Sequence, residues 1–173
     1  MARIKWSERR FDFNFPVELY PELLERLRGT PARLADRLAS VAPERLVQRS
    51  GQGWSIQEHA GHLADLDEGL FLPRLDEYAL GLATLRGADM TNRQTEAANH
   101  NARPLHAILE RVRETRTRIM NRLEALEPGA FKQVALHPRL RVEMRLLDMV
   151  CFHAEHDDYH LASISEILRA PAN

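Results

Sequence analysis

Apolar residues recur at spacings of three and four along most of the chain. This period is typical of helices with one buried face, and no alternating run that would predict a strand is sustained anywhere. Sparse glycines and prolines divide the pattern into four long helical segments: residues 17–41, 53–81, 104–126 and 142–169. Four such helices in 173 residues predict an all-α fold, a four-helix bundle.

Local signals predict where two of these helices begin and bend. Gly29-Thr30-Pro31 interrupts the first segment, which we expect to be bent or double, with Thr30 as a cap and Pro31 in the next first turn. Ser55 and Glu58 form the pattern of a capping box at the start of the second segment. Pro73 is expected to kink or divide that helix.

The remaining segments predict connections. Residues 84–101 are polar and less periodic, which favours a long crossover over the bundle with a short helix in it. Residues 127–144 are expected to form a second irregular link, and residues 1–16 an irregular opening. The length suits one domain with a real core, so we assign residues 1–173 to a single bundle domain.

Charge and cysteine content narrow the function classes. Lys and Arg total 24 against 25 Asp and Glu, and this balance argues against a nucleic-acid or membrane partner. Cys151 is the only cysteine, so no internal disulfide can form, and the first residues lack the apolar stretch of a signal peptide. We therefore expect a cytoplasmic protein.

The last helix carries three histidines on its apolar stripe. At about 100° per residue, His156 lies roughly 40° to one side of His160, and His153 about 20° to the other. Cys151 lies about 180° from His160, which makes a Cys–His pair within this helix unfavourable. The histidines therefore interrupt the stripe that should face the core.

Buried imidazoles need partners, and two explanations stay open. Each ring could pair with a buried carboxylate or carbonyl, or the rings could share a metal ion, since histidines four residues apart can reach one cation. The second helix offers further imidazoles, His59 and His62, at the inner edge of its own stripe. Imidazole ligands suit zinc, nickel or iron better than magnesium or calcium. Asp65 and Asp157 are candidates to orient the rings.

The segments "WSIQEHAGHLADLD" and "FHAEHDDYHLASI" together resemble the DinB/YfiT-like superfamily of metal-dependent bundles. That family shows a Trp-Ser/Thr helix start, a histidine eight residues after the Trp, and an H-x-x-x-H pair on the last helix. The resemblance spans about residues 17–168 and implies an up-down-down-up arrangement. It implies a divalent metal ion on His62, His156 and His160.

Members of this superfamily use a low-molecular-weight thiol as co-substrate, so the resemblance implies thiol S-transfer to a small electrophile. An open metal position can bind a thiol as thiolate. His59 and His153 are extra histidines beside the motif and could replace or supplement a ligand. Asn99, His100 and Arg139 are candidate substrate contacts, Arg139 for an anionic group.

Three other functions remain open. The metal could activate water for hydrolysis. His62 with adjacent His156-Asp157 is similar to the pattern of HD-type phosphohydrolases, but the further downstream aspartate that those enzymes need is missing. A non-catalytic bundle could store metal or associate as a homodimer, for which Phe71, Leu75 and Leu82 are a candidate face.

Overall fold

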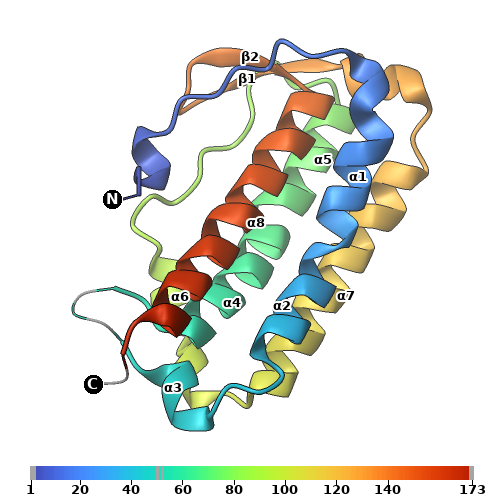
Figure 1. The fold of residues 1–173 in the computed structure, drawn as a ribbon. Coiled ribbons are helices and arrows are strands. Elements are labelled where there is room, and N and C mark those ends of the chain that lie inside the picture. The colour runs from blue at the N-terminus through green and yellow to red at the C-terminus, as the bar shows by residue number, and fades with distance from the viewer. Residues whose placement is uncertain (1–2, 50, 52, 172–173) are drawn as a thin grey trace.

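A computed structural model of the chain describes residues 3–49, 51 and 53–171. Its helices are α1 (Tyr20–Arg28), α2 (Thr30–Leu38), α3 (Pro43–Val47), α4 (Ile56–Leu66), α5 (Leu72–Ala79), α6 (Arg93–Ala98), α7 (Leu105–Glu124) and α8 (Leu146–Arg169). In Figure 1, α1 with α2 and α4 with α5 each form one rod, and α7 and α8 are the other two. The all-α four-helix bundle is confirmed.

The rods follow an up-down-down-up order (Figure 1). The α4–α5 and α7 rods run in the same direction, so the chain between them returns along the length of the bundle, and this long crossover contains α6. The rod of α1 and α2 packs against α7 and α8, and α4 packs against both α7 and α8. The inner faces of α4 and α8 are therefore in contact, which brings together the two histidine-bearing segments.

The second helix starts as its sequence predicts. Ser55 Oγ accepts from Glu58 N at 3.1 Å, and the Glu58 carboxylate accepts from Ser55 N at 2.8 Å. A cap of this kind stabilises a helix by about 1 kcal/mol. The cap predicted at Thr30 is wrong, because Thr30 lies inside α2 and its hydroxyl donates to Asp157 at 2.8 Å.

The rod of α4 and α5 is interrupted just before Pro73. Residues Asp67–Phe71 form a widened, π-type turn, and Pro73 lies in the first turn of α5. Proline has no N–H for the preceding carbonyls, which explains why the α-helical pattern breaks here. The turn leaves the Asp67 side chain fully buried in the bundle.

The link before the last helix contains two strands, so the expectation of no strand was wrong here. Strands β1 (Val134–His137) and β2 (Val142–Arg145) pair antiparallel, with Ala135 opposite Met144. Each has four residues, too few for an alternating pattern to stand out in the sequence. Since β2 takes residues 142–145, α8 begins at Leu146.

The N-terminal segment is irregular, as predicted, but it is docked on α8. Arg3 donates to the carbonyl of Tyr159 at 2.8 Å and to Ser163 Oγ at 3.0 Å. The Trp6 ring packs edge-on against His156, with ring centroids 5.1 Å apart. This segment therefore forms part of the surroundings of the α8 histidines.

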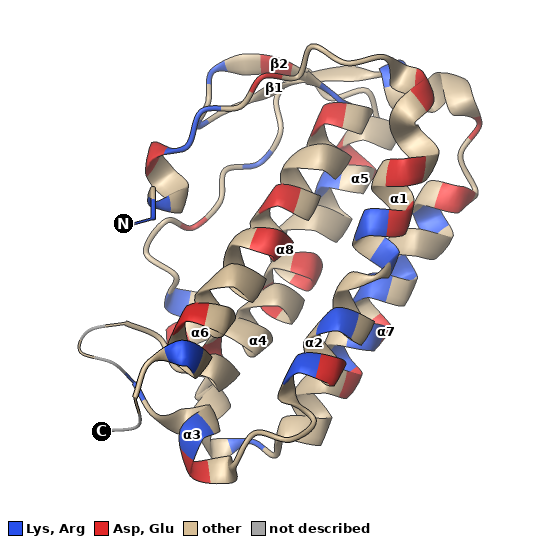
Figure 2. Ribbon diagram, viewed as in Figure 1, with Lys and Arg blue, Asp and Glu red and all other residues tan. Residues whose placement is uncertain are grey.

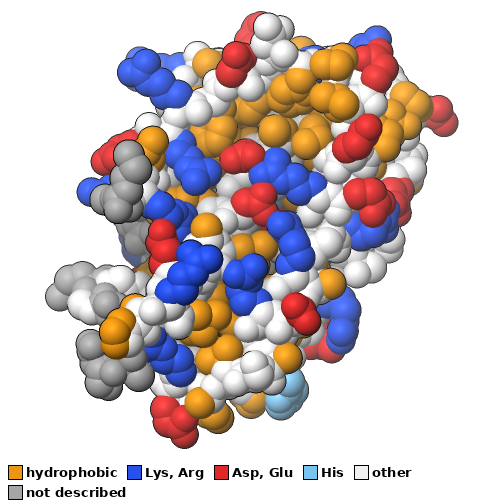
Figure 3. All heavy atoms as spheres, viewed as in Figure 1, with side chains coloured by type: hydrophobic (Ala, Val, Ile, Leu, Met, Phe, Trp, Pro, Cys, Tyr) orange, Lys and Arg blue, Asp and Glu red, His pale blue; other side chains and the backbone are white. Residues whose placement is uncertain are grey.

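Charges of both signs cover the helices in Figure 2, and they are interspersed on the face drawn in Figure 3. Among the described residues, no helix is long and apolar enough to cross a membrane. The candidate dimer face is not a surface, because Phe71 and Leu75 are buried in the core, although Leu82 is exposed. Homodimerisation itself stays a prediction.

Candidate metal centre

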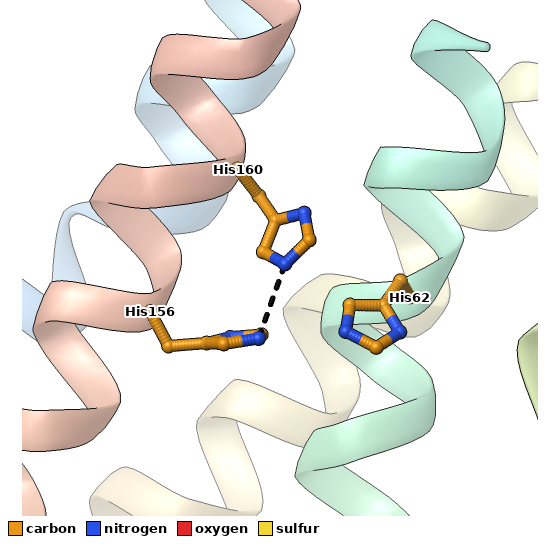
Figure 4. A group of neighbouring side chains, drawn as sticks. All are labelled: His62, His156 and His160. Atoms are coloured by element: carbon orange, nitrogen blue, oxygen red, sulfur yellow. Dashed lines mark hydrogen bonds between the residues drawn. The ribbon is translucent and has the colours of Figure 1, made fainter. Parts of the chain in front are cut away.

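Three imidazoles from two helices converge inside the bundle (Figure 4). His62 projects from α4, and His156 and His160 project from α8, one turn apart. All three side chains are buried, and each offers one ring nitrogen within 4.8 Å of the others. The two α8 rings face each other through Nε2 atoms 3.1 Å apart. Among the described residues, these three form the group of His, Cys, Asp and Glu side chains arranged to hold a metal ion.

The ring of His62 is fixed by a chain of two hydrogen bonds. Its Nδ1 lies 2.8 Å from Thr95 Oγ1, and the Thr95 hydroxyl donates to Asp65 at 3.0 Å. With its hydrogen used for Asp65, Thr95 accepts from the Nδ1–H of His62. The proton is then on Nδ1, and Nε2 carries the lone pair that a metal needs. Asp65 thus acts on His62 through Thr95.

Asp65 is held as an anion by several donors. His100 Nε2 lies 2.8 Å from it and Arg111 donates at 2.7 Å. Burial raises the pKa of Asp65, but these donors outweigh burial and hold the pKa below its ordinary value. An ionised Asp65 is the state that accepts from Thr95.

His160 has an analogous partner in His59. Their Nδ1 atoms are 2.8 Å apart, so one ring donates to the other. If His160 donates, its Nε2 is free to bind a metal, and His59 orients the ring from outside the triad. Trp54 packs near both, with centroids 5.5 Å from His59 and 6.0 Å from His160.

The triad imidazoles and the ring of His59 are neutral at pH 7. Burial lowers the pKa of His62 to about 3 and that of His59 to about 4. Burial first, and then the neighbouring imidazoles, hold the pKa values of His156 and His160 well below 6.5. Metals bind the neutral form of histidine, so no imidazolium has to lose a proton before binding.

The donor set fits a divalent metal ion. His156 Nδ1 is buried without a hydrogen-bond partner among the described residues, while its Nε2 is shared with His160. Without a cation, one of the two facing Nε2 atoms must carry a proton for the 3.1 Å contact to be a hydrogen bond. A cation between the rings would accept both Nε2 lone pairs.

His153 belongs to a different buried cluster, one turn from the triad. Its Nε2 lies 2.8 Å from Asp67 Oδ1 and its ring stacks on Phe71 at 3.5 Å. Arg116 donates to Asp67 at 3.1 Å and to Asp157 at 2.6 Å. The Nε2 of His153 also lies 3.1 Å from Arg116, but the shorter contact with the carboxylate identifies Nε2 as the donor to Asp67.

This ion cluster accounts for two predicted site residues. His153 and Asp157 are satisfied by Arg116 and Asp67, and neither contacts a ring of the triad through a hydrogen bond among the described residues. Asp157 faces Arg116, so the His-Asp arrangement of an HD-type phosphohydrolase is not formed around His62.

The triad forms part of the wall of a cavity of about 540 Å³. Its wall is aromatic and apolar over a large part, including Trp6, Trp54, Phe71 and Phe152. A cavity of this size suits a small molecule. Cys151 is outside this wall, and burial raises the pKa of its thiol, which makes it a poor nucleophile.

The three candidate substrate contacts separate into two groups. Arg139 lines the cavity. His100 does not: it packs against Gly61, where a Cβ would come within 2.3 Å of its ring, and it binds Asp65. Asn99 is exposed and also lies outside the cavity wall.

The model of the DinB superfamily matches residues 26–164. The chain belongs to the DinB superfamily. The matched range contains the triad, the cavity helices and the crossover.

Solved structures show the same DinB fold. YfiT from Bacillus subtilis, described as a probable metal-dependent hydrolase with an unusual four-helix bundle topology, is 20% identical with a TM-score of 0.76, and the alignment covers 93% of this chain and 92% of that chain. A mycothiol-dependent maleylpyruvate isomerase is 14% identical with a TM-score of 0.67, over 87% of this chain and 61% of that chain. A comparison with curated proteins gave no match.

Sequence patterns missed several residues around the DinB triad. Thr95 lies in the crossover and Trp6 in the irregular opening, and neither segment has a period that points inward. Arg116 is on a helix rich in arginines, so its burial could not be distinguished from the exposure of its neighbours. The burial of Asp67 depends on the π-type turn, which the hydrophobic pattern of the sequence does not predict.

Proposed function

We propose that this protein is a metal-dependent enzyme that joins a low-molecular-weight thiol to a small electrophile: the S–H proton is lost, and the sulfur forms a bond to the electrophile as its leaving group departs. The observation that carries the proposal is the position of the triad: three neutral imidazoles, close enough to share one metal ion, lie in the wall of a cavity whose size suits a small molecule. The likeness in fold to a mycothiol-dependent isomerase supports the thiol part.

In this proposal each residue has a stated task. His62, His156 and His160 hold a divalent metal ion, zinc, nickel or iron. The metal would act as a Lewis acid that lowers the pKa of the thiol sulfur. Thr95 and His59 hold the Nδ1 sides of two ligand rings, so that the rings do not rotate. The aromatic wall excludes water and accommodates the electrophile.

Hydrolysis is a second candidate, favoured by the description of YfiT as a probable metal-dependent hydrolase. The same triad and cavity would serve a water molecule in place of a thiol. The two reactions differ in their need for a thiol. A cytoplasmic location, where small thiols are reduced, stays a prediction from the sequence.

The first experiment is elemental analysis of tag-free protein, after reconstitution with zinc, nickel or iron, in three variants. We expect about one equivalent of metal in the wild type and in His106→Ala, whose side chain is exposed on α7. His62→Ala and His160→Ala should lose it while keeping their helical circular dichroism. A wild type that binds no metal after reconstitution would refute the proposal.

The second experiment tests the reaction. Loaded protein is incubated with 1-chloro-2,4-dinitrobenzene and glutathione, bacillithiol or mycothiol, and the thioether is quantified. We expect formation above the uncatalysed rate with at least one thiol, absent in His160→Ala. Metal-dependent cleavage of ester substrates without any thiol, and no thioether with any of the three, would favour the hydrolase.

A further inference from the structure

A second polar group lines the cavity away from the triad, and it consists of donors. Arg139, in the turn between β1 and β2, and His137, at the end of β1, both line the cavity, as does Arg74 of α5. His137 and Arg74 are 2% and 1% exposed. They come from elements far apart in the chain, so only the tertiary fold brings them together.

Two of these donors have no partner. Arg139 Nη2 and His137 Nε2 are buried and make no hydrogen bond among the described residues. The backbone N–H of Leu140 donates to His137 Nδ1 at 3.2 Å, so Nδ1 is an acceptor and the hydrogen of the neutral ring is on Nε2. Both orphaned atoms are therefore N–H donors, and leaving them unpaired costs free energy.

Arg74 adds positive charge, and no carboxylate of the described part of the chain pairs with it. Its guanidinium donates to the carbonyl of Arg86 at 2.8 Å and to Met149 Sδ at 3.5 Å. Glu77 lies in its neighbourhood but forms its ion pair with Arg86, at 2.6 Å. A buried guanidinium that binds only a carbonyl and a thioether is under-compensated.

The guanidiniums of Arg74 and Arg139 repel each other, and both disfavour a positive charge on His137. Burial, followed by the charges of Arg74 and Arg139, lowers the pKa of His137 to about 4. Burial chiefly, with a contribution from Arg139, also lowers the pKa of Arg74. Asp89 lines the cavity as well, but its carboxylate bonds to Thr91 at 2.9 Å and pairs with Arg93. An anion placed among the three donors would remove both the repulsion and the unpaired N–H groups.

The position of the cluster relates it to the triad. The His137 ring is 5.2 Å from Phe152, and the Arg139 guanidinium lies over the same ring at 5.8 Å. Phe152 precedes His156 by one turn of α8, a rise of about 6 Å. The wall between the two sites is aromatic, with Trp6 5.0 Å from Phe152 and 5.1 Å from His156.

We propose that Arg139, His137 and Arg74 form a carboxylate-binding subsite that positions an organic-acid substrate with its reacting end toward the histidine triad. The substrate class is a small acid whose carboxylate is separated from the reacting atom by an apolar spacer that lies along the aromatic wall. This inference deepens the proposed function and rests on it for what happens at the reacting end, but not for the binding of the carboxylate.

The test uses the two tryptophans of the chain, Trp6 and Trp54, which both line the cavity. Metal is stripped by dialysis against a chelator that is then removed, and intrinsic fluorescence is followed during titration with 3-phenylpropanoate or its neutral amide, 3-phenylpropanamide. A hydrogen-bonded charge should favour the carboxylate by about ten-fold or more in the metal-free wild type.

Variants test whether Arg139 is the source of this preference for the carboxylate. Arg139→Gln should reduce the preference for the carboxylate to about two-fold or less, and Arg139→Lys should retain part of it because the charge remains. Arg141→Gln is the matched control, an exposed arginine in the same turn, and should behave as the wild type. If Arg139→Gln does not fold, the lysine variant and the comparison of acid with amide in the wild type still test whether the subsite binds a carboxylate.

Several results would overturn the subsite: equal binding of acid and amide by the wild type, no binding of either, an unchanged preference in Arg139→Gln, or binding of the acid only after zinc is added. The last result would place the carboxylate on the metal. Conversely, a protein that binds the acid selectively but takes up no metal would retain the subsite and lose the proposed S-transfer, so the two failures are distinguishable.

Discussion

Two buried polar clusters lie one turn apart on α8, and they differ in how they are satisfied. The ion cluster of Asp67, Arg116, His153 and Asp157 closes on itself, with each charge facing an opposite charge. Among the residues that the structure describes, the triad of His62, His156 and His160 has no opposing charge in direct contact, and its ring nitrogens converge beside a cavity. Neighbouring histidines on one helix face thus have different surroundings.

The comparison teaches how to separate structural from functional histidines. His153 has a carboxylate at 2.8 Å and a ring stacked on it, which is what a core histidine needs. His156, three residues later, has an Nδ1 without a partner in the described part of the chain and an Nε2 that faces another Nε2. Unmet bonding capacity beside open space indicates a ligand, whereas completed bonding indicates stability.

The largest expected effect on stability comes from removing the central arginine of the ion cluster. Arg116→Met leaves Asp67 and Asp157 buried without their common partner, so the free energy of unfolding should fall by about 3–5 kcal/mol. Urea denaturation followed by circular dichroism measures it. Arg113→Met, on the exposed face of α7, should change stability by less than about 1 kcal/mol. A similar loss in both variants would mean that the ion cluster has no special role.

Acid should destabilise the metal-free protein through the triad. The folded pKa of His62 is about 3, below its ordinary 6.5, so as the pH falls the unfolded chain takes up the proton first. The contribution of neutral His62 to the free energy of unfolding is intact above about pH 6.5 and is lost as the pH falls toward 3. At about 1.4 kcal/mol per pH unit, protonation of His62 in the unfolded chain lowers the free energy of unfolding by about 3 kcal/mol at pH 4.

Urea midpoints of metal-free protein at pH 7, 5 and 4 measure this loss. His62→Leu should flatten the pH profile, and His106→Leu, which changes an exposed histidine, should leave it as steep as in the wild type. Equal slopes in His62→Leu and the wild type would contradict the assignment of the acid sensitivity to the triad.

A smaller effect is expected from removing the hydrogen bond that orients the His62 ring. Thr95→Val keeps the shape but removes the hydroxyl between His62 and Asp65. Zinc affinity, measured in competition with a chromogenic chelator, should fall by about 10- to 100-fold, whereas stability should change little. Thr117→Val, at an exposed site of α7, is the control. Unchanged affinity in Thr95→Val would remove Thr95 from the site.

The sequence predicted the bundle because helical periodicity depends on neighbours three and four residues apart, and such spacing is visible in a single chain. The capping box at Ser55 was predictable for the same reason, since both of its bonds are local. The grouping of His62, His156 and His160 followed from helix-face geometry and from the resemblance to the DinB superfamily; that they bind a metal stays a proposal.

Only the tertiary structure decided which polar residues the histidines meet. His153 and His156 share one stripe in the sequence, but a π-type turn places Asp67 beside the first and the fold places Trp6 beside the second. Thr95 reaches His62 from the crossover, and His137 and Arg74 reach the cavity from a strand and another helix. Helical period fixes which side of a helix faces inward; contacts between distant segments fix what that side touches.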